Sequence, residues 1–318
     1  MNDVLVIMRS SRAGRIVFVL CVAPAFAFGQ DGASADPKSV SSAGSLSFPS
    51  TATTLTQDQI KELIQKVSEN DIQNDKKQRD YTYIEREVEH KLDGKGNTKS
   101  TETKTYDVLE VYGEQVQKLS EKDDKPLSPK EATKEDEKIQ KIIDKRKNES
   151  EKDREKRLKA EEKDREESRK WVSEVSDAYN FRLVGTESVG GCEAWVIAAE
   201  PRPGFVPHLK YANYLSKFHG RVWIDKADLE VSKMDVECLD TVSWGLFVAR
   251  LHKGTRFTLE QTRVNDEVWL PQSLSFKLDA RLALLKGLKV DDEQTFRDYK
   301  KFRTEAKITS VGEVQEQK

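Results

Sequence analysis

The chain has 318 residues, with 54 Lys and Arg against 56 Asp and Glu, so its formal net charge is -2. This near balance argues against a general nucleic-acid coat, which needs excess positive charge to displace counterions. Charged residues make up 35% and hydrophobic residues 36%, with a mean hydropathy of -0.72, which indicates a highly charged segment diluting an ordinary domain.

The N-terminus has the pattern of an export signal. Three arginines between residues 9 and 15 precede an apolar run, which ends near the small-residue step Ala25-Phe26-Ala27. A basic region, an apolar core and an A-x-A site predict a secretory signal peptide over residues 1–29, with a buried helix as the alternative. We therefore expect the mature protein in the periplasm.

Cys21 raises the alternative of a lipid-anchored protein. Leu20 stands directly before Cys21, where lipid attachment usually requires a small residue, so the anchored form is not favoured. Residues 30–54 are rich in Ser, Ala, Gly and Asp and are expected to form a disordered linker.

Removal of the signal peptide leaves two cysteines, Cys192 and Cys238, each inside an expected strand. An even pair in an oxidising compartment permits one disulfide, and two buried free thiols are the alternative. The chain has no C-x-x-C motif, so thiol-exchange chemistry is not expected.

The first expected elements are a helix and a hairpin. Residues 57–70 carry apolar side chains at helical spacing, and Thr56 can serve as the N-cap. Residues 81–92 alternate, with Tyr and Glu on one side and Thr, Ile, Arg and Val on the other. The turn sequence Asp-Gly-Lys-Gly-Asn then leads into a second strand over residues 98–111. A short strand is expected from about residue 114 to residue 119.

The segment 128–170 differs from the rest of the chain because it is densely charged with both signs interleaved and contains no Gly or aromatic residue. Glu and Lys recur three and four residues apart, which predicts a solvated helical insertion. Ile139, Ile142 and Ile143 are among the few residues that could dock it. A partner-binding coiled coil is the alternative, although apolar heptads are not sustained.

From Trp171 onward the sequence is rich in strands with few helices, which predicts an antiparallel sheet. A short helix is expected over residues 208–219. Residues 272–285 form the clearest strand, in which apolar residues alternate with Lys, Asp and Arg.

Residues for catalysis or metal binding do not form a recognisable pattern. His90, His208, His219 and His252 have no metal-ligand spacing, and no nucleophile elbow, phosphate loop or dinucleotide fingerprint is present. We therefore expect no enzyme activity, no cofactor and no metal.

A curved sheet with one apolar face could instead leave a cavity for an acyl chain, since each buried methylene stabilises binding by about 0.8 kcal/mol. A filled core is the alternative. The expected cavity lining is Trp223, Phe257, Leu259, Leu278, Leu282 and Leu284.

Two segments carry a family resemblance. The strand-turn-strand Gly-Arg-Val-Trp-Ile-Asp-Lys at 220–226 with 231–236, and His-Lys-Gly-Thr-Arg-Phe at 252–257 followed by a Trp-Leu-Pro step at 269–271, resemble the LolA/LolB-like superfamily. This superfamily includes outer-membrane lipoprotein-sorting proteins and RseB-type regulators. The resemblance implies an α+β fold with a strongly curved antiparallel sheet, an incomplete barrel whose open side is covered by helices. It implies no cofactor.

The resemblance gives the expected organisation and function. Residues 55–310 are expected to form a single half-barrel domain interrupted by the 128–170 insertion, with a tail at 311–318. The implied function is a periplasmic carrier or binding protein for lipid or lipoprotein acyl chains. The alternative is an envelope regulatory or scaffold protein that binds a protein partner. Membrane contact is expected to be peripheral at most.

Overall fold

The computed structural model describes residues 55–112, 114–244, 249–282, 287–302, 306–310 and 313–316, so the expected signal peptide and linker lie outside the described part. None of the described helices has the length and apolar character needed to cross a membrane.

The helical elements are α2 (Gln57–Gln78), α3 (Pro129–Lys147), α4 (Glu151–Ala178) and the 3-10 helix η1 (Lys210–Lys217). The strands are β1 (Tyr81–Leu92), β2 (Thr98–Val111), β3 (Glu114–Lys122), β4 (Lys125–Pro126), β5 (Tyr179–Val189), β6 (Cys192–Pro201), β7 (Phe218–Asp225), β8 (Val231–Cys238), β9 (Val242–Trp244), β10 (Ala249–Leu251), β11 (Arg256–Val264), β12 (Val268–Leu282), β13 (Leu288–Lys301), β14 (Ala306–Ser310) and β15 (Glu313–Glu316).

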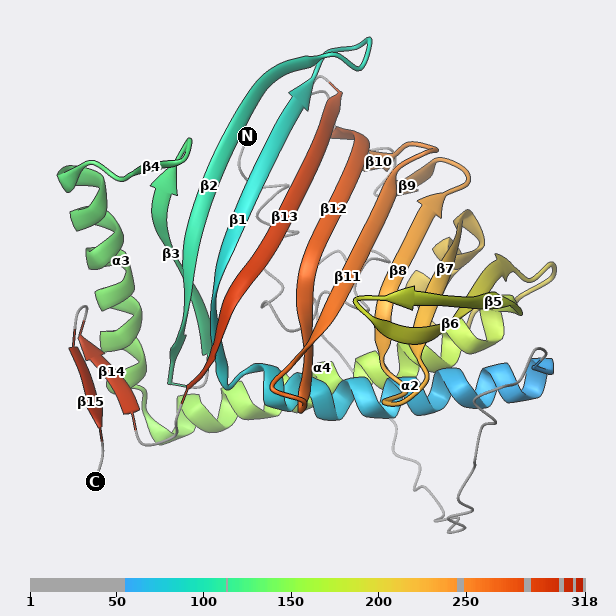
Figure 1. Cartoon of the computed structure of the whole chain (residues 1–318), viewed down its shortest axis with the longest axis horizontal. Helices are drawn as coiled ribbons and strands as arrows, with labels where there is room; N and C mark the ends of the chain where they lie inside the picture. The colour runs from blue at the N-terminus through green and yellow to red at the C-terminus, as the bar shows by residue number, and fades with distance from the viewer. Residues whose placement is uncertain are drawn as a thin grey trace.

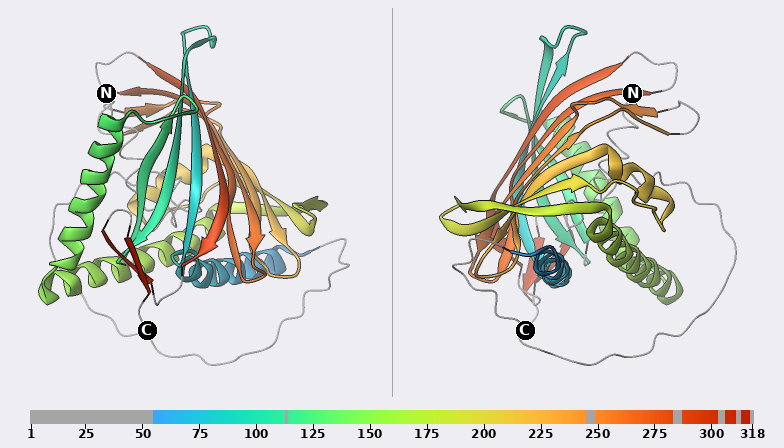
Figure 2. Two further views of the ribbon diagram at one scale, coloured as in Figure 1. Left: turned by 60° about the vertical axis from the view of Figure 1, so that its left-hand side comes forward. Right: turned by 90° about the vertical axis from the view of Figure 1, so that its right-hand side faces the viewer.

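One antiparallel sheet of 13 strands dominates the fold. Its order is β4-β3-β2-β1-β13-β12-β11-β8-β7-β6-β5, and the short strands β9 and β10 extend it beside β12. The sheet is curved and does not close on itself; α2 and α4 lie across one end of the strands, and α3 runs along the edge formed by β3 and β4 (Figures 1 and 2). The expected fold class, an α+β protein with a strongly curved antiparallel sheet, is confirmed.

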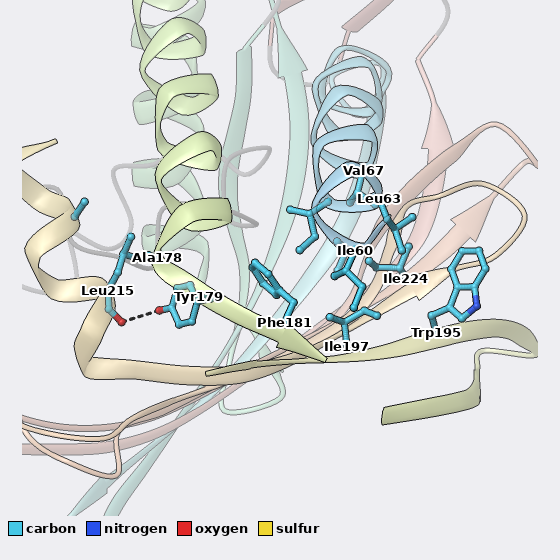
Figure 3. Packing of buried hydrophobic residues seen from close by; sticks show 13 residues of the cluster. Ile60, Leu63, Val67, Ala178, Tyr179, Phe181, Trp195, Ile197, Leu215 and Ile224 are labelled. Carbon is cyan, nitrogen blue, oxygen red and sulfur yellow. Dashed lines mark hydrogen bonds between the residues drawn. The ribbon is translucent and has the colours of Figure 1, made fainter. Parts of the chain in front are cut away.

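The main hydrophobic core lies where α2 packs on β5, β6 and β7. Thr56 begins this helix with a capping box, in which its hydroxyl accepts from Gln59 N–H and the Gln59 side chain returns to the Thr56 backbone. The apolar face of the helix points at strand residues (Figure 3). The buried members of this core are Ile60, Leu63, Ile64, Val67, Ala178, Tyr179, Phe181, Trp195, Ile197, Ala212, Leu215, Ile224 and Val231.

The charged segment expected as an insertion forms α3 and α4, and these two helices connect the outermost strands of the sheet, β4 and β5. α3 docks on β2 through Ile139 and Ile143, which are buried against Val111. α4 reaches the opposite edge, where Ala178 joins the main core. The segment therefore links the two edges of the open barrel and does not merely project from it (Figure 2).

The C-terminal part of the described chain adds a small separate sheet. β14 pairs with β15 in antiparallel register, Lys307 opposite Gln315 and Ile308 opposite Val314. Residues 313–316 of the expected tail thus form a strand.

The two cysteines are free thiols, the alternative to a disulfide. Cys238 lies opposite Phe218, the first residue of β7. Cys192 lies near the other end of β7, because Ala194, two residues further along β6, lies opposite Asp225, the last residue of β7. Seven residues of strand separate these two points, roughly 23 Å at the usual rise of a strand. A disulfide needs Cα atoms within about 7 Å, so the fold does not permit this pair to bridge.

Candidate functional site

One face of the curved sheet is apolar over many strands, because residues that pair across neighbouring strands point to the same side. Across the sheet, Ile197 pairs with Val222, Val222 with Met234, Met234 with Leu259, and Leu259 with Leu274. We call the side that carries these residues the apolar face. α2 lies on the same side, since its core partners include Ile197.

Beyond the main core, the apolar face continues as two further clusters of buried residues. The first consists of Tyr83, Val108, Phe257, Leu259, Leu274 and Phe296. The second consists of Phe218, Cys238, Val242 and Leu251. The first cluster lies on β1, β2 and β11 to β13, and the second lies on β7 to β10.

Partly buried apolar side chains on β8 and β12 border these clusters. Between β8 and β12 runs β11, which contributes the buried residues Phe257 and Leu259. We call the combined set the apolar band: Met234, Val236, Phe257, Leu259, Phe276, Leu278 and Ala280. The ring centroids of Phe257 and Phe276 are 5.0 Å apart. Because the outer members are only partly buried, the band can present hydrocarbon surface to a ligand.

Three of the residues expected to line a cavity belong to this band. Phe257 and Leu259 are buried at 2% and 0% exposure, and Leu278 is partly buried beside them. Leu282 is the last residue of β12 and pairs with Ala249 of β10. Leu284 lies outside the described residues.

Trp223, the first residue of the expected lining, lies on the opposite face of the sheet. It pairs with Lys233, and the neighbouring Val222 is the β7 residue that faces the band. Its indole N–H donates to Glu187 at 2.7 Å, and the Lys233 ammonium lies 5.4 Å from the ring centroid. The expectation was wrong because Val222, Trp223 and Ile224 are all apolar, so alternation does not indicate which of them points inward.

The same face becomes acidic along β1, where Glu85, Glu87 and Glu89 follow Tyr83 at every second position and are all buried. Glu85 accepts a hydrogen bond from Gln117 at 2.7 Å. The Glu89 carboxylate lies 3.0 Å from the Lys91 ammonium.

A carboxylate of β13 joins this acidic region. Oxygens of Glu87, Glu89 and Asp292 lie within 4.8 Å of one another, a spacing at which three carboxylates could share a cation. The alternation of Tyr and Glu is visible in the sequence. It does not indicate burial, because charged residues are rarely buried without a partner.

Two hollows among the described residues lie away from the apolar band. One, of about 500 Å³, lies at the junction of α3 and α4 around Asn148 and Glu149. The other, of about 310 Å³, lies by the turn between β7 and β8, where Arg263 and Trp269 line it together with Cys192. The band is therefore a surface of packed side chains and not the wall of one of these hollows.

No protein-family model matches the chain, and no curated protein matches it. Among solved structures, an outer membrane lipoprotein-sorting protein domain from Vibrio parahaemolyticus is similar at 13% identity, covering 76% of this chain and 94% of that chain, with a TM-score of 0.30. A LolA superfamily protein from Nitrosomonas europaea has 9% identity, 79% and 94% coverage and a TM-score of 0.28. The Pseudomonas aeruginosa MucA/MucB complex has 10% identity, 77% and 99% coverage and a TM-score of 0.22.

The Nitrosomonas europaea protein is described as a member of the LolA superfamily. In this chain, the Trp-Leu-Pro step at 269–271 helps to attach α2 to the sheet, because Asn74 of α2 forms hydrogen bonds with the Trp269 backbone. The Trp269 indole N–H donates to the Asp228 carboxylate at 2.8 Å, and Arg263 lies 3.0 Å from the same carboxylate. The Trp-Leu-Pro step thus helps to fix the helix end of the sheet, whereas the other segments with the resemblance contribute Met234, Val236 and Phe257 to the apolar band.

Proposed function

We propose that this protein is an exported binding protein that carries acyl chains of lipids or lipoproteins on the apolar band, without catalysis. The observation that carries the proposal is the row of partly buried apolar side chains on β8 and β12, which flanks the buried Phe257 and Leu259. The band has no titratable group that could act as a nucleophile or general base.

The physical chemistry of the band supports an acyl ligand. Each methylene that leaves water for an apolar surface stabilises the complex by about 0.8 kcal/mol, so a long chain gains considerable free energy without any polar contact. The export signal expected over residues 1–29 would place the protein in an aqueous compartment, where an acyl chain requires such shelter.

A comparison of two charge insertions tests the proposal. Leu278→Asp places a carboxylate in the band, whereas Val88→Asp places one at a partly buried position on the opposite face of β1. We expect native mass spectrometry of the wild type to show a co-purified lipid, and uptake of a fluorescent fatty acid to fall at least about tenfold in Leu278→Asp alone. A lipid-free wild type without uptake would reject the proposal.

A second function, binding of a protein partner in the envelope, is favoured by α4. Its first part is exposed and dense in both charges, and it connects the two edges of the sheet. Reversing four exposed lysines, Lys152, Lys156, Lys159 and Lys163, to Glu would alter this surface without removing the connection. Loss of a pull-down partner with unchanged fatty-acid uptake would support this function, and an unchanged partner set would reject it.

A further inference from the structure

The two edges of the large sheet differ in how they are covered. At one edge, β4 is only two residues long, Lys125–Pro126, and its proline has no backbone N–H for a further strand. α3 lies beside this edge, where the ammonium of Lys118 on β3 is 2.7 Å from the carboxylate of Asp136. The other edge is β5, which is 11 residues long and pairs in the described part of the chain with β6 alone (Figure 1). The β5 edge therefore offers backbone groups to a further strand.

The beginning of β5 already has an outer neighbour. Gln57 forms hydrogen bonds with both backbone groups of Phe181, which therefore point away from β6. Alternation directs the backbone groups of Leu183 to the same outer side. Among the described residues, no side chain bonds to the backbone of residues 182–189, which we call the open edge. The open edge contains no proline or lysine, residues that protect many strand edges.

A β-bulge lies in the open edge. The register with β6 shifts after Leu183, so Val184 is an extra residue on β5. The Val184 side chain is 43% exposed, one of two large apolar side chains that are exposed among the described residues. A bulge can protect an edge by bending it, but here it leaves hydrocarbon surface in water. A second strand on the open edge would cover this surface.

The bulge places two opposite charges on the same face of β5. Arg182 lies opposite Ala198, and Glu187 lies opposite Ala194. Ala198 and Ala194 are four residues apart on β6 and therefore point to the same side of the sheet. Arg182 and Glu187 thus share the face that carries Trp223, whose indole N–H donates to Glu187.

We propose that two copies of this chain associate through the open edge, with β5 of one copy antiparallel to β5 of the other. Two-fold symmetry about a point between Val184 and Gly185 places Arg182 of each copy opposite Glu187 of the other. Opposite charges that face each other across an antiparallel pair stabilise it, and this pair occurs twice. The association goes beyond the proposed function, because it does not depend on a ligand of the apolar band.

The backbone geometry of β5 permits this register. Residues that face each other in an antiparallel pair must both direct their backbone groups toward the partner strand or both away from it. Leu183 and Thr186 lie opposite Ile197 and Trp195, which are two residues apart on β6, so their backbone groups point the same way. In the proposed register Leu183 of one copy lies opposite Thr186 of the other, and the two can exchange backbone hydrogen bonds. Without the extra residue of the bulge, the charged pair would require an inward residue to face an outward one.

Sedimentation velocity of the purified protein over about a hundredfold range of concentration measures the association. We expect a monomer–dimer equilibrium for the wild type. Arg182→Glu places like charges opposite each other twice and should raise the dissociation constant of the dimer at least about tenfold. The double variant Arg182→Glu/Glu187→Arg restores opposite charges between the copies and should recover most of the lost affinity. Arg297→Glu makes the same charge change at an exposed position of β13, a strand with neighbours on both sides, and should leave the dimer unchanged.

Amide hydrogen exchange of the wild type gives a second readout that needs no variant. We expect residues 182–189 to exchange at least about tenfold more slowly at high than at low protein concentration. Equal protection at every concentration would indicate that the segment before Leu55, which leads into Gln57 beside this edge, covers the edge in the same chain, and would reject the dimer.

Three further results would overturn the proposal. They are a wild type that stays monomeric at every concentration, a dimer that Arg182→Glu does not weaken, and a double variant as weak as Arg182→Glu alone. The last result would show that Arg182 and Glu187 do not face each other between the copies.

Discussion

The side-chain amide of Asn74 pairs with both backbone groups of Trp269. Its Nδ2 donates to the carbonyl oxygen at 2.7 Å, and the Trp269 N–H donates to Oδ1 at 2.8 Å. β12 begins at Val268 but pairs with β13 only from Ser273, so the helix side chain supplies the hydrogen bonds of a missing strand neighbour. α2 repeats this pairing at the outer edge of β5, where Gln57 bonds both backbone groups of Phe181.

Loss of the Asn74 amide should destabilise the protein. In Asn74→Ala, two buried backbone groups of Trp269 lose their partner, and we expect the free energy of unfolding to fall by about 1–3 kcal/mol. Gln78 also donates to the Trp269 carbonyl at 3.0 Å, so the carbonyl keeps one bond and the larger loss falls on the N–H. Denaturant unfolding measures the effect, with the exposed Gln65→Ala as the control. Equal stability of the two variants would show that the pairing contributes little.

Gly220 lies where β7 and β8 approach closely. A Cβ at this position would overlap the carbonyl oxygen of Asp235 and lie 3.2 Å from the Cα of Val236. Since both atoms belong to the backbone of β8, relief requires a shift of the strand, and Gly220→Ala should cost about 1–3 kcal/mol. Gly185→Ala is the matched control in β5, because nothing lies within 4 Å of its added Cβ. Thermal unfolding should show a lower midpoint for the first variant alone, and similar midpoints would contradict the overlap.

The two cysteines should differ in reactivity. Cys238 is fully buried, its Sγ lies 2.9 Å from the carbonyl oxygen of Asp240, and burial raises the pKa of its thiol. Cys192 is partly exposed. Because the thiolate is the reactive form, iodoacetamide should label Cys192 in the native protein and reach Cys238 only in denaturant. Peptide-resolved mass spectrometry measures this, and a peptide pair joined by a disulfide would contradict the separation along β7.

Much of the fold could be predicted from local patterns. The helical spacing after Thr56, the alternation along residues 272–285 and the long charged segment correspond to α2, β12 and the pair α3 and α4. These elements depend on short-range periodicity and capping, which the sequence displays directly.

Side-chain direction and long-range connection were harder to predict. Trp223 has apolar neighbours on both sides, so only pairing with β6 and β8 decides its face. Glu85 and Glu87 have the composition of a solvated strand, yet they are buried because residues distant in sequence, Gln117 among them, approach them. The joining of the two sheet edges by α3 and α4 likewise depends on strand order, which local pattern does not contain.

The beginning of α3 should be sensitive to acid. Glu131 accepts hydrogen bonds from Ser128 and pairs with Lys122 of β3 at 3.1 Å, and the bonds to Ser128 and Lys122 lower the pKa of Glu131 to about 2. A lowered pKa means that the contribution of this carboxylate is present above its ordinary value of 4.5 and is lost as the pH falls toward 2. We therefore expect the first turn of α3 to lose amide protection in this range. Glu131→Gln, which keeps an oxygen for the capping box but not the charge, should remove the pH dependence, whereas the exposed Glu137→Gln should retain it. A carboxyl titration of Glu131 at its ordinary value would show that the contacts with Ser128 and Lys122 do not persist in solution, and the acid sensitivity of the helix start would then need another cause.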